Sequence, residues 1–388
     1  MVNILVIGCD NREDLLLPFK NLVTKSNLYF IKYNREKGNN YTKYGVVINW
    51  EEYKDAYSLL RKNNIIRVVF YSYEELKHIA LRVAAKELGI KCSHLDHGIR
   101  IYKEHLKLST HKRKYIFFLI LPKFLLSRFY FCTFIKAKKE SKIFLWKYNI
   151  IRQTKDIIQI GSFFPDSEYF ILDQYICYSP FVRDGLIKEL KVDPAKIQTK
   201  FIGFPKFNVL NNLQYSTQSR NILFIDQPFH EHKLFGWTKH EKEKFWIDLR
   251  KKLSDKKFNL IVKPHPVSDK SVYKKLDIEI DNNIGKDFFA VMGFYSTLLL
   301  PLVAEANIPV ICFNNHPEKL EEIQNHFLVK AKMAIGIDKI DDIDLSYSTI
   351  ESFLRTKQQN LNAFIEYFLY KKDELFSKRL VDILIADE

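Results

Sequence analysis

The sequence predicts an α/β protein with two Rossmann-like domains that face each other across a cleft. Short apolar runs alternate with charged stretches of helical period in the first half of the chain, and again from residue 222 onward. This alternation is typical of parallel strands connected by helices that cover the sheet. The length of 388 residues exceeds one ordinary core and favours two domains. A polar stretch at 211–220 separates the two series and indicates a linker.

Each series supplies its own strands and helices. The first predicts strands at 4–7, 46–48, 68–71 and 92–95, a strand and turn at 175–179, and helices at 73–88 and 180–190. The second predicts strands at 222–225, 260–262, 288–292 and 309–313, and helices at 239–253 and 298–306. From residue 346 the pattern is helical and charged. We therefore expect an N-terminal acceptor-binding domain at 1–212 and a C-terminal nucleotide-sugar-binding domain at 213–345. The helices of 346–388 are expected to pack over the junction between these two domains.

The chain carries 61 basic and 46 acidic side chains, a formal net charge of +15. Such an excess usually reflects an anionic partner: nucleic acid, an anionic membrane surface, or a phosphorylated or carboxylated substrate. We expect no nucleic-acid partner, because no zinc-finger spacing or aromatic ribonucleoprotein motif is present. Five scattered cysteines without paired spacing indicate reduced core residues and a cytosolic setting. The chain opens on a strand-like run without a signal-type segment, so export is not expected.

Residues 107–142 form a basic segment in which Lys and Arg surround two apolar runs, at 116–121 and 129–135. The segment is too interrupted to span a bilayer, which takes roughly twenty consecutive apolar residues. Such a pattern suits the headgroup region of an anionic membrane, but a buried helical pair with solvated basic ends would also produce it. The overall positive charge favours the membrane. The side chains expected to face it are Lys112, Arg113, Lys114, Lys123 and Arg128.

Two polar turns in the second series, each after a predicted buried strand, suggest an anion site. The first is a Lys-Pro-His-Pro turn at 263–266, and the second contains Ser296 and Thr297. Ligands of open α/β sheets lie at the carboxyl ends of strands, where these turns are expected. Lys263 and His265 can supply positive charge and a donor to a nucleotide phosphate. Ser296 and Thr297, near a helix start, would add hydroxyl and N–H donors. Alternatively, the first turn merely ends a strand and the second merely caps a helix.

Two further strand ends carry polar residues. Asp96 and His97 follow the strand at 92–95, and Gly98 lets the chain turn tightly there. Either side chain could take a proton from an acceptor hydroxyl, although Asp96 could instead cap a helix. Gln227 follows the strand at 222–225 and could bind a base or ribose. No metal site is expected, since the histidines lack ligand spacing, and the turn after residue 8 lacks the further glycines of a dinucleotide loop.

Several motifs in order resemble the bacterial sialyltransferases and polysialyltransferases of the GT-B, or two-Rossmann, type. These families carry an acidic-acidic-Gly motif, a His-Pro motif and a Ser-Ser or Ser-Thr motif. The motifs here are Asp96-His97-Gly98, Gly203-Phe204-Pro205-Lys206, the strand and turn 222–228, Lys263-Pro264-His265-Pro266, and Phe294-Tyr295-Ser296-Thr297.

The resemblance implies an inverting, metal-independent transfer of a sialic-acid-like (nonulosonic) sugar from a CMP-sugar donor to a surface glycan, such as a capsule or lipopolysaccharide. Asp96 would match the acidic base motif, and His265, Ser296 and Thr297 would bind the departing phosphate. Lys263, Pro266, Gln227 and Gly203 would complete the nucleotide site. No cofactor is implied. The enzyme is expected on the cytoplasmic, inner face of a bacterial plasma membrane.

One position departs from this family, because His97 stands where a second acidic residue is usual. The base is therefore either Asp96 or His97. Polymerases that transfer glycerol phosphate from CDP-glycerol also resemble the chain and keep a histidine at that position. A CDP-glycerol or CDP-ribitol type of polyol-phosphate transferase is thus an alternative function. A non-catalytic GT-B subunit of a polysaccharide assembly complex is another.

Overall fold

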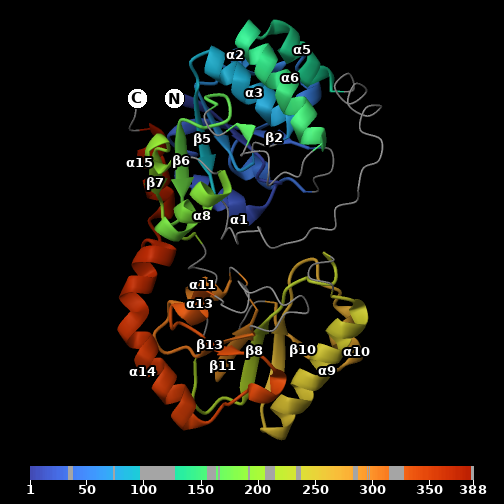
Figure 1. Cartoon of the computed structure of the whole chain (residues 1–388), viewed down its shortest axis with the longest axis vertical. Coiled ribbons are helices and arrows are strands. Elements are labelled where there is room, and N and C mark those ends of the chain that lie inside the picture. The colour runs from blue at the N-terminus through green and yellow to red at the C-terminus, as the bar shows by residue number, and fades with distance from the viewer. Residues whose placement is uncertain are drawn as a thin grey trace. The chain divides into compact units, whose positions relative to one another are not determined.

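The computed structural model describes most of the chain as two compact α/β units. The described residues are 1–33, 38–72, 75–96, 127–154, 163–164, 167–190, 193–205, 215–232, 237–282, 287–294, 296, 298–313 and 327–385. The first unit contains the described residues up to Pro205 and those from Asp373 onward, and the second contains those between Lys206 and Lys372. Figure 1 labels many of the elements of both units.

The first unit is built on a parallel sheet in the order β3-β2-β1-β4-β5-β6-β7. Its strands are β1 (Val2–Ile7), β2 (Ser26–Lys32), β3 (Val46–Asn49), β4 (Arg67–Phe70), β5 (Lys91–Leu95), β6 (Gln174–Cys177) and β7 (Thr199–Phe201). Its α-helices are α1 (Glu13–Leu16), α2 (Ala56–Lys62), α3 (Leu76–Glu87), α5 (Arg128–Lys136), α6 (Lys139–Thr154), α8 (Pro180–Leu190) and α15 (Phe376–Ile385). The central strands are fully buried, because helices cover both faces of such a sheet.

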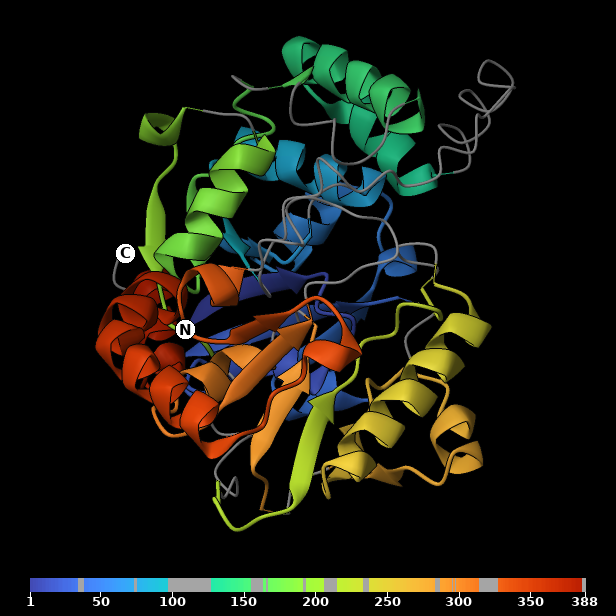
Figure 2. The same ribbon diagram turned by 60° about the horizontal axis from the view of Figure 1, so that its bottom comes forward.

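The second unit has a parallel sheet in the order β10-β9-β8-β11-β12-β13. Its strands are β8 (Asn221–Ile225), β9 (Asn259–Lys263), β10 (Glu279–Ile280), β11 (Ala290–Gly293), β12 (Val310–Phe313) and β13 (Ile335–Ile337). Its helices are α9 (Lys239–Asp255), α10 (Ser271–Lys275), α11 (Leu299–Val303), α13 (Phe327–Lys330) and α14 (Tyr347–Phe364), which a π-helical segment (Ile365–Leu369) extends. Figure 1 shows α9 and α10 toward the β10 edge of this sheet and α14 toward the β13 edge, and Figure 2 shows the same helices from another direction.

Aromatic side chains form the core under α9. Phe224 of β8 lies in the middle of this cluster, with its ring centroid 4.8 Å from that of Trp246 and 5.6 Å from that of Phe294. The start of α9 is fixed by a capping box, in which Thr238 and Glu241 each accept the other's backbone N–H. This aromatic cluster therefore packs the carboxyl ends of β8 and β11 against α9.

The predicted fold class is confirmed, and the predicted strands coincide with observed ones. Four strands were not predicted: β2, β7, β10 and β13. At the chain's end, α14 belongs to the second unit and α15 to the first. In the first unit, Ser377 of α15 donates to the carbonyl of Pro18, and Arg379 donates to the carbonyl of Ile202. The final helix is thus an integral part of the first unit.

Candidate functional site

The polar turns predicted in the second unit lie at one edge of its sheet. Strand β8 lies between β9 and β11, and all three run parallel. Their carboxyl ends therefore bring Gln227, the turn 263–266 and Ser296 to the same edge. This neighbourhood depends on the strand order, which the sequence does not reveal.

His265 is partly exposed and oriented by its own turn. Its Nδ1 accepts the backbone N–H of Val267 at 3.4 Å, and its ring centroid lies 6.3 Å from that of His232. With Nδ1 as an acceptor, the neutral ring carries its proton on Nε2. Nε2 is then the nitrogen that can donate to an anionic oxygen.

A buried carboxylate holds the turn that carries His265. Oδ2 of Asp226, in a side chain only 3 % exposed, accepts from the Ser268 hydroxyl at 2.6 Å, the Tyr273 hydroxyl at 2.5 Å and Nζ of Lys242 at 3.3 Å. Burial raises the pKa of Asp226, against the opposing effect of Lys242. Lys242 also donates to Glu231 at 2.8 Å. The buried network, as we call Asp226, Lys242, Glu231, Ser268 and Tyr273, therefore fixes the backbone just after His265.

The remaining second-unit residues differ in their surroundings. Lys263 donates to the carbonyl of Asn282, and burial lowers its pKa. Gln227 is partly exposed, and its carbonyl accepts the N–H of Phe229 at 2.9 Å. Pro266 is exposed. Lys263 thus already uses one of its three N–H donors within the fold.

Ser296 stands just before α11. Its hydroxyl oxygen accepts the N–H of Leu298 at 3.2 Å, which leaves the hydroxyl hydrogen as a donor. Thr297 lies outside the described residues. α11 has only five residues, fewer than the predicted 298–306, so a helix dipole adds little here. The Ser296 hydroxyl, rather than the helix dipole, is therefore the group that can donate to an anion at this strand end.

In the first unit, Asp96 follows β5 directly and is buried. Its side chain is 1 % exposed, its N–H donates to the carbonyl of Ile176 at 3.0 Å, and its Oδ2 lies 3.8 Å from Nε2 of His94. His94, also buried, has its Nδ1 2.9 Å from the carbonyl oxygen of Phe70. His97 lies outside the described residues. Asp96 therefore sits at the sheet edge but within the protein interior.

Gly203 lies in the first unit, whereas the other described residues predicted for the nucleotide site lie in the second. Its φ of +87° is one that L side chains rarely adopt, and its N–H donates to the carbonyl of Tyr178 at 3.1 Å. The turn after β7 therefore accounts for the presence of a glycine at this position. Its role in nucleotide binding remains a prediction.

One polar residue at the carboxyl edge of the second sheet was not predicted as a site residue. His232 follows β8, and its ring lies beside that of His265. The turn after β8 was considered only as far as residue 228. The strand-end rule that found His265 would also have found this histidine.

The region from Lys20 to just beyond the end of β12 matches one protein family. The alpha-2,8-polysialyltransferase (POLYST) family model matches residues 20–315. The chain belongs to this family. As a member of the polysialyltransferase family it is a glycosyltransferase. No curated protein matches the chain.

Solved glycosyltransferases share the fold of this polysialyltransferase-family chain. A glycosyltransferase from Rickettsia africae ESF-5 has a TM-score of 0.52 and 12% identity over 98% of this chain and 97% of that one. SnogD from Streptomyces nogalater has a TM-score of 0.51 and 10% identity over 98% and 99%. The wall teichoic acid polymerase TagF has a TM-score of 0.50 and 10% identity over 100% and 88%. The fold is GT-B, as the sequence predicted.

The basic segment of this polysialyltransferase-family chain is described only from residue 127. Lys112, Arg113, Lys114 and Lys123 lie outside the described residues, and Arg128 is exposed at the start of α5. Figure 2 shows α5 and α6 lying together, and both pack on α3. Phe129 and Tyr130 are buried there. The burial of these two residues agrees with the alternative interpretation of the segment as a buried helical pair.

No helix in the described part of the chain is long and apolar enough to cross a membrane. Nor do the described residues contain a group of three or more His, Cys, Asp or Glu side chains placed to hold a metal ion. Metal independence remains a prediction for this polysialyltransferase-family chain.

Proposed function

We propose that the chain transfers a nonulosonic acid from a CMP-sugar to a surface glycan, with inversion and without a metal. The family match supports a sialic-acid-type transfer. The observation that carries the nucleotide side of the proposal is the orientation of His265, whose Nε2 is the donor nitrogen at an edge shared with Ser296. Capsule or lipopolysaccharide are the acceptors that the motif resemblance suggests.

In this proposal the bond between the anomeric carbon and a CMP phosphate oxygen breaks, and an acceptor oxygen bonds to that carbon from the opposite face. Negative charge grows on the departing phosphate. His265, Ser296 and Lys263 would stabilise it with donors that are already in place. Thr297, Gln227, Pro266 and Gly203 would complete the nucleotide site.

The acceptor hydroxyl must lose its proton during transfer. Asp96 and His97 remain the two candidates for the base. The burial of Asp96 favours it as the group that orients its neighbours, because a side chain that is 1 % exposed does not meet an acceptor directly. This favours His97, which follows it in the chain, as the residue that takes the proton.

Nucleotide binding gives a first test. CMP should raise the melting temperature, because a ligand that binds only the folded protein adds about 2.7 kcal/mol of stability at roughly 100 times its Kd. UDP and GDP should leave the melting temperature unchanged. A thermal-shift comparison of CMP, CDP, UDP and GDP measures this.

The same comparison separates the alternatives. A stronger response to CDP than to CMP, with release of CMP from CDP-glycerol, would favour polyol-phosphate transfer. No response to any nucleotide would favour a non-catalytic subunit. A response to UDP or GDP would refute the CMP-sugar proposal.

We further propose that the enzyme binds an anionic membrane through the outer face of α6. Ile143 and Trp146 are 49% and 54% exposed on this helix. They lie on one face with Lys139 and Lys147, since residues four and seven or eight apart share a side of a helix. Exposed apolar side chains flanked by lysines suit the headgroup region, and Trp is favoured there.

Vesicle binding tests this surface. Replacing both Ile143 and Trp146 with Ala should weaken binding to vesicles containing phosphatidylglycerol by roughly tenfold, because the lost apolar area no longer enters the interface. Co-sedimentation with such vesicles measures the effect. The matched control is Ile247→Ala, which removes an equally exposed apolar side chain from α9.

A second set of variants in the vesicle experiment tests the contribution of positive charge to membrane binding. Changing Lys112, Arg113 and Lys114 to Glu should also weaken binding to anionic vesicles. If both sets of variants bind as the unchanged protein does, neither the outer face of α6 nor the basic segment is a membrane surface.

A further inference from the structure

A second histidine lies beside His265 at the carboxyl edge of the second sheet. His232 ends the turn that follows β8, whereas His265 belongs to the turn that follows β9. The two ring centroids are 6.3 Å apart, with the ring planes at 75°. His232 is exposed and His265 is partly exposed, so solvent reaches both residues. Two separate strand ends thus place two imidazoles at one accessible spot.

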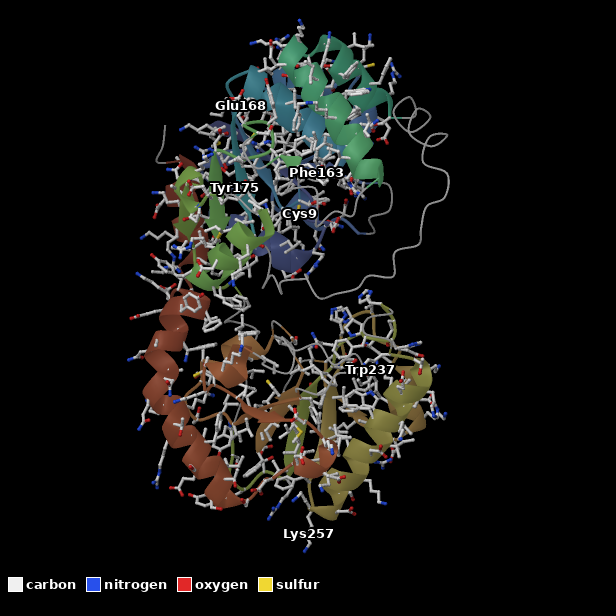
Figure 3. The ribbon with its side chains drawn as sticks, viewed as in Figure 1. Cys9, Phe163, Glu168, Tyr175, Trp237 and Lys257 are labelled. Atoms are coloured by element: carbon white, nitrogen blue, oxygen red, sulfur yellow. The ribbon has the colours of Figure 1, made fainter. Side chains whose placement is uncertain are left out.

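The turn that carries His232 is anchored in the protein core. Its closing bond runs from the His232 N–H to the carbonyl of Pro228, at 3.0 Å. Phe229, inside the turn, is 2% exposed, and its ring centroid lies 4.9 Å from that of Phe294 and 5.4 Å from that of Trp237. Figure 3 labels Trp237, which stands just before α9. The backbone of His232 is therefore fixed to the aromatic core.

Two carboxylates join the turn after β8 to the turn after β9. Oε1 of Glu231 accepts the backbone N–H of Asp269 at 2.7 Å and bonds Nζ of Lys242 at 2.8 Å. Oδ2 of Asp226 accepts the hydroxyl of Ser268 at 2.6 Å. These bonds belong to the buried network, and both carboxylates direct an oxygen to donors inside it. The network therefore fixes the backbones of the two histidines relative to each other.

A pair of imidazoles at this spacing suits a ligand with two neighbouring anionic groups. Each neutral ring supplies one N–H donor, and an N–H···O bond spans about 2.7–3.2 Å. With centroids 6.3 Å apart, each ring can donate to a separate group when the two groups branch from one atom. A metal ion such as zinc takes at least three protein ligands. The described residues contain no group of three or more His, Cys, Asp or Glu side chains placed to hold one.

We propose that His232 binds the carboxylate of the donor sugar while His265 binds the adjacent phosphate. This inference rests on the proposed function, which assigns the phosphate to His265 and supplies a nonulosonic acid. In such a donor the anomeric carbon carries both the carboxylate and the oxygen of the CMP phosphate. His232 therefore selects donors that carry a second anionic group next to the phosphate. The second phosphate of CDP presents similar chemistry, so the test includes CDP.

Equilibrium binding tests His232 without turnover. The unreactive donor analogue CMP-3-fluorosialic acid carries the carboxylate, its methyl ester masks the carboxylate, and CMP lacks it. His232→Ala should raise Kd for the acid about tenfold, the effect of losing one hydrogen bond to a charged group. Kd for CMP and Kd for the ester should stay unchanged in this variant. Isothermal titration calorimetry measures all three.

The unchanged protein and CDP complete the comparison. The unchanged protein should bind the ester about tenfold more weakly than the acid, because the ester has lost the charge that His232 meets. CDP should bind the unchanged protein and His232→Ala equally, since it carries no sugar carboxylate.

The matched control is His240→Ala. His240 is likewise exposed, on α9 of the same unit. This variant should bind the acid as the unchanged protein does. Melting followed by circular dichroism checks the fold of both variants, and His232→Ala should melt as the unchanged protein does because its side chain is exposed.

Three results would overturn the assignment of His232: equal binding of the acid by His232→Ala and the unchanged protein, equal weakening of acid and ester by the substitution, or a loss confined to CDP. The last result would assign His232 to a second phosphate instead. Failure of the proposed function looks different. In that case neither CMP nor the acid binds the unchanged protein, and the carboxylate assignment falls with it.

Discussion

Replacing His265 with Ala is expected to lower kcat for transfer from a CMP-sugar by about 10²- to 10³-fold, the usual effect of removing one donor to a developing anion. The Val267 N–H binds Nδ1 of His265, so the ring proton lies on Nε2. This Nε2–H is the donor that the substitution removes. Release of CMP by the purified protein, with saturating acceptor, measures the effect. The melting temperature should change little, because His265 is partly exposed.

His240→Ala is the matched control for this prediction. His240 is exposed on α9 in the same unit, and its loss should leave kcat unchanged. Changing Ser296 and Thr297 together to Ala should abolish transfer in the same way. Near-full turnover in the folded His265 and Ser296–Thr297 variants would refute the assignment of the phosphate site.

Much of the fold could be predicted because buried parallel strands leave a strong sequence signal. The run Leu260 to Val262 is apolar throughout, and it forms the buried part of β9. The missed strands are mostly short edge strands with weak signals, such as the two-residue β10 and the Ile-Gly-Ile of β13. β2 escaped prediction although Leu28 to Ile31 is as apolar as its neighbours.

The candidate site could be predicted only in part. Strand ends pointed to His265 and Ser296, because their turns follow clear apolar runs. The sequence gives no strand order, so it could not show that β8 lies between β9 and β11. Nor does Asp226 look different from an exposed turn residue, since its burial depends on Ser268 and Tyr273, over forty positions away.

His232 and His265 illustrate a different limit. Each follows its own strand, and no local motif links them. Only the parallel pairing of β8 with β9 and the bonds of the buried network bring the two rings together. A site assembled from separate strand ends is therefore visible from sequence only after the topology is known.

Replacing Asp226 with Ala is expected to reduce the free energy of unfolding of the second unit by about 3 kcal/mol, near the lower end for breaking a buried ion pair. The change leaves Lys242 buried with Glu231 as its remaining acidic partner and removes the acceptor of two hydroxyls. Urea unfolding, followed by Trp fluorescence, measures the loss. Asp341→Ala is the control, because that side chain is 89% exposed and its surface pair with Lys252 contributes little.

Asp226→Asn separates stability from catalysis. The amide keeps the shape of the side chain but not its charge, so the variant should fold, and the turn 263–266 should lose part of its support. We expect kcat to fall about tenfold with little change in KM for the CMP-sugar, because His265 meets the phosphate best only when its backbone is fixed. If unfolding becomes easier while kcat stays unchanged, the buried network stabilises the unit without positioning His265.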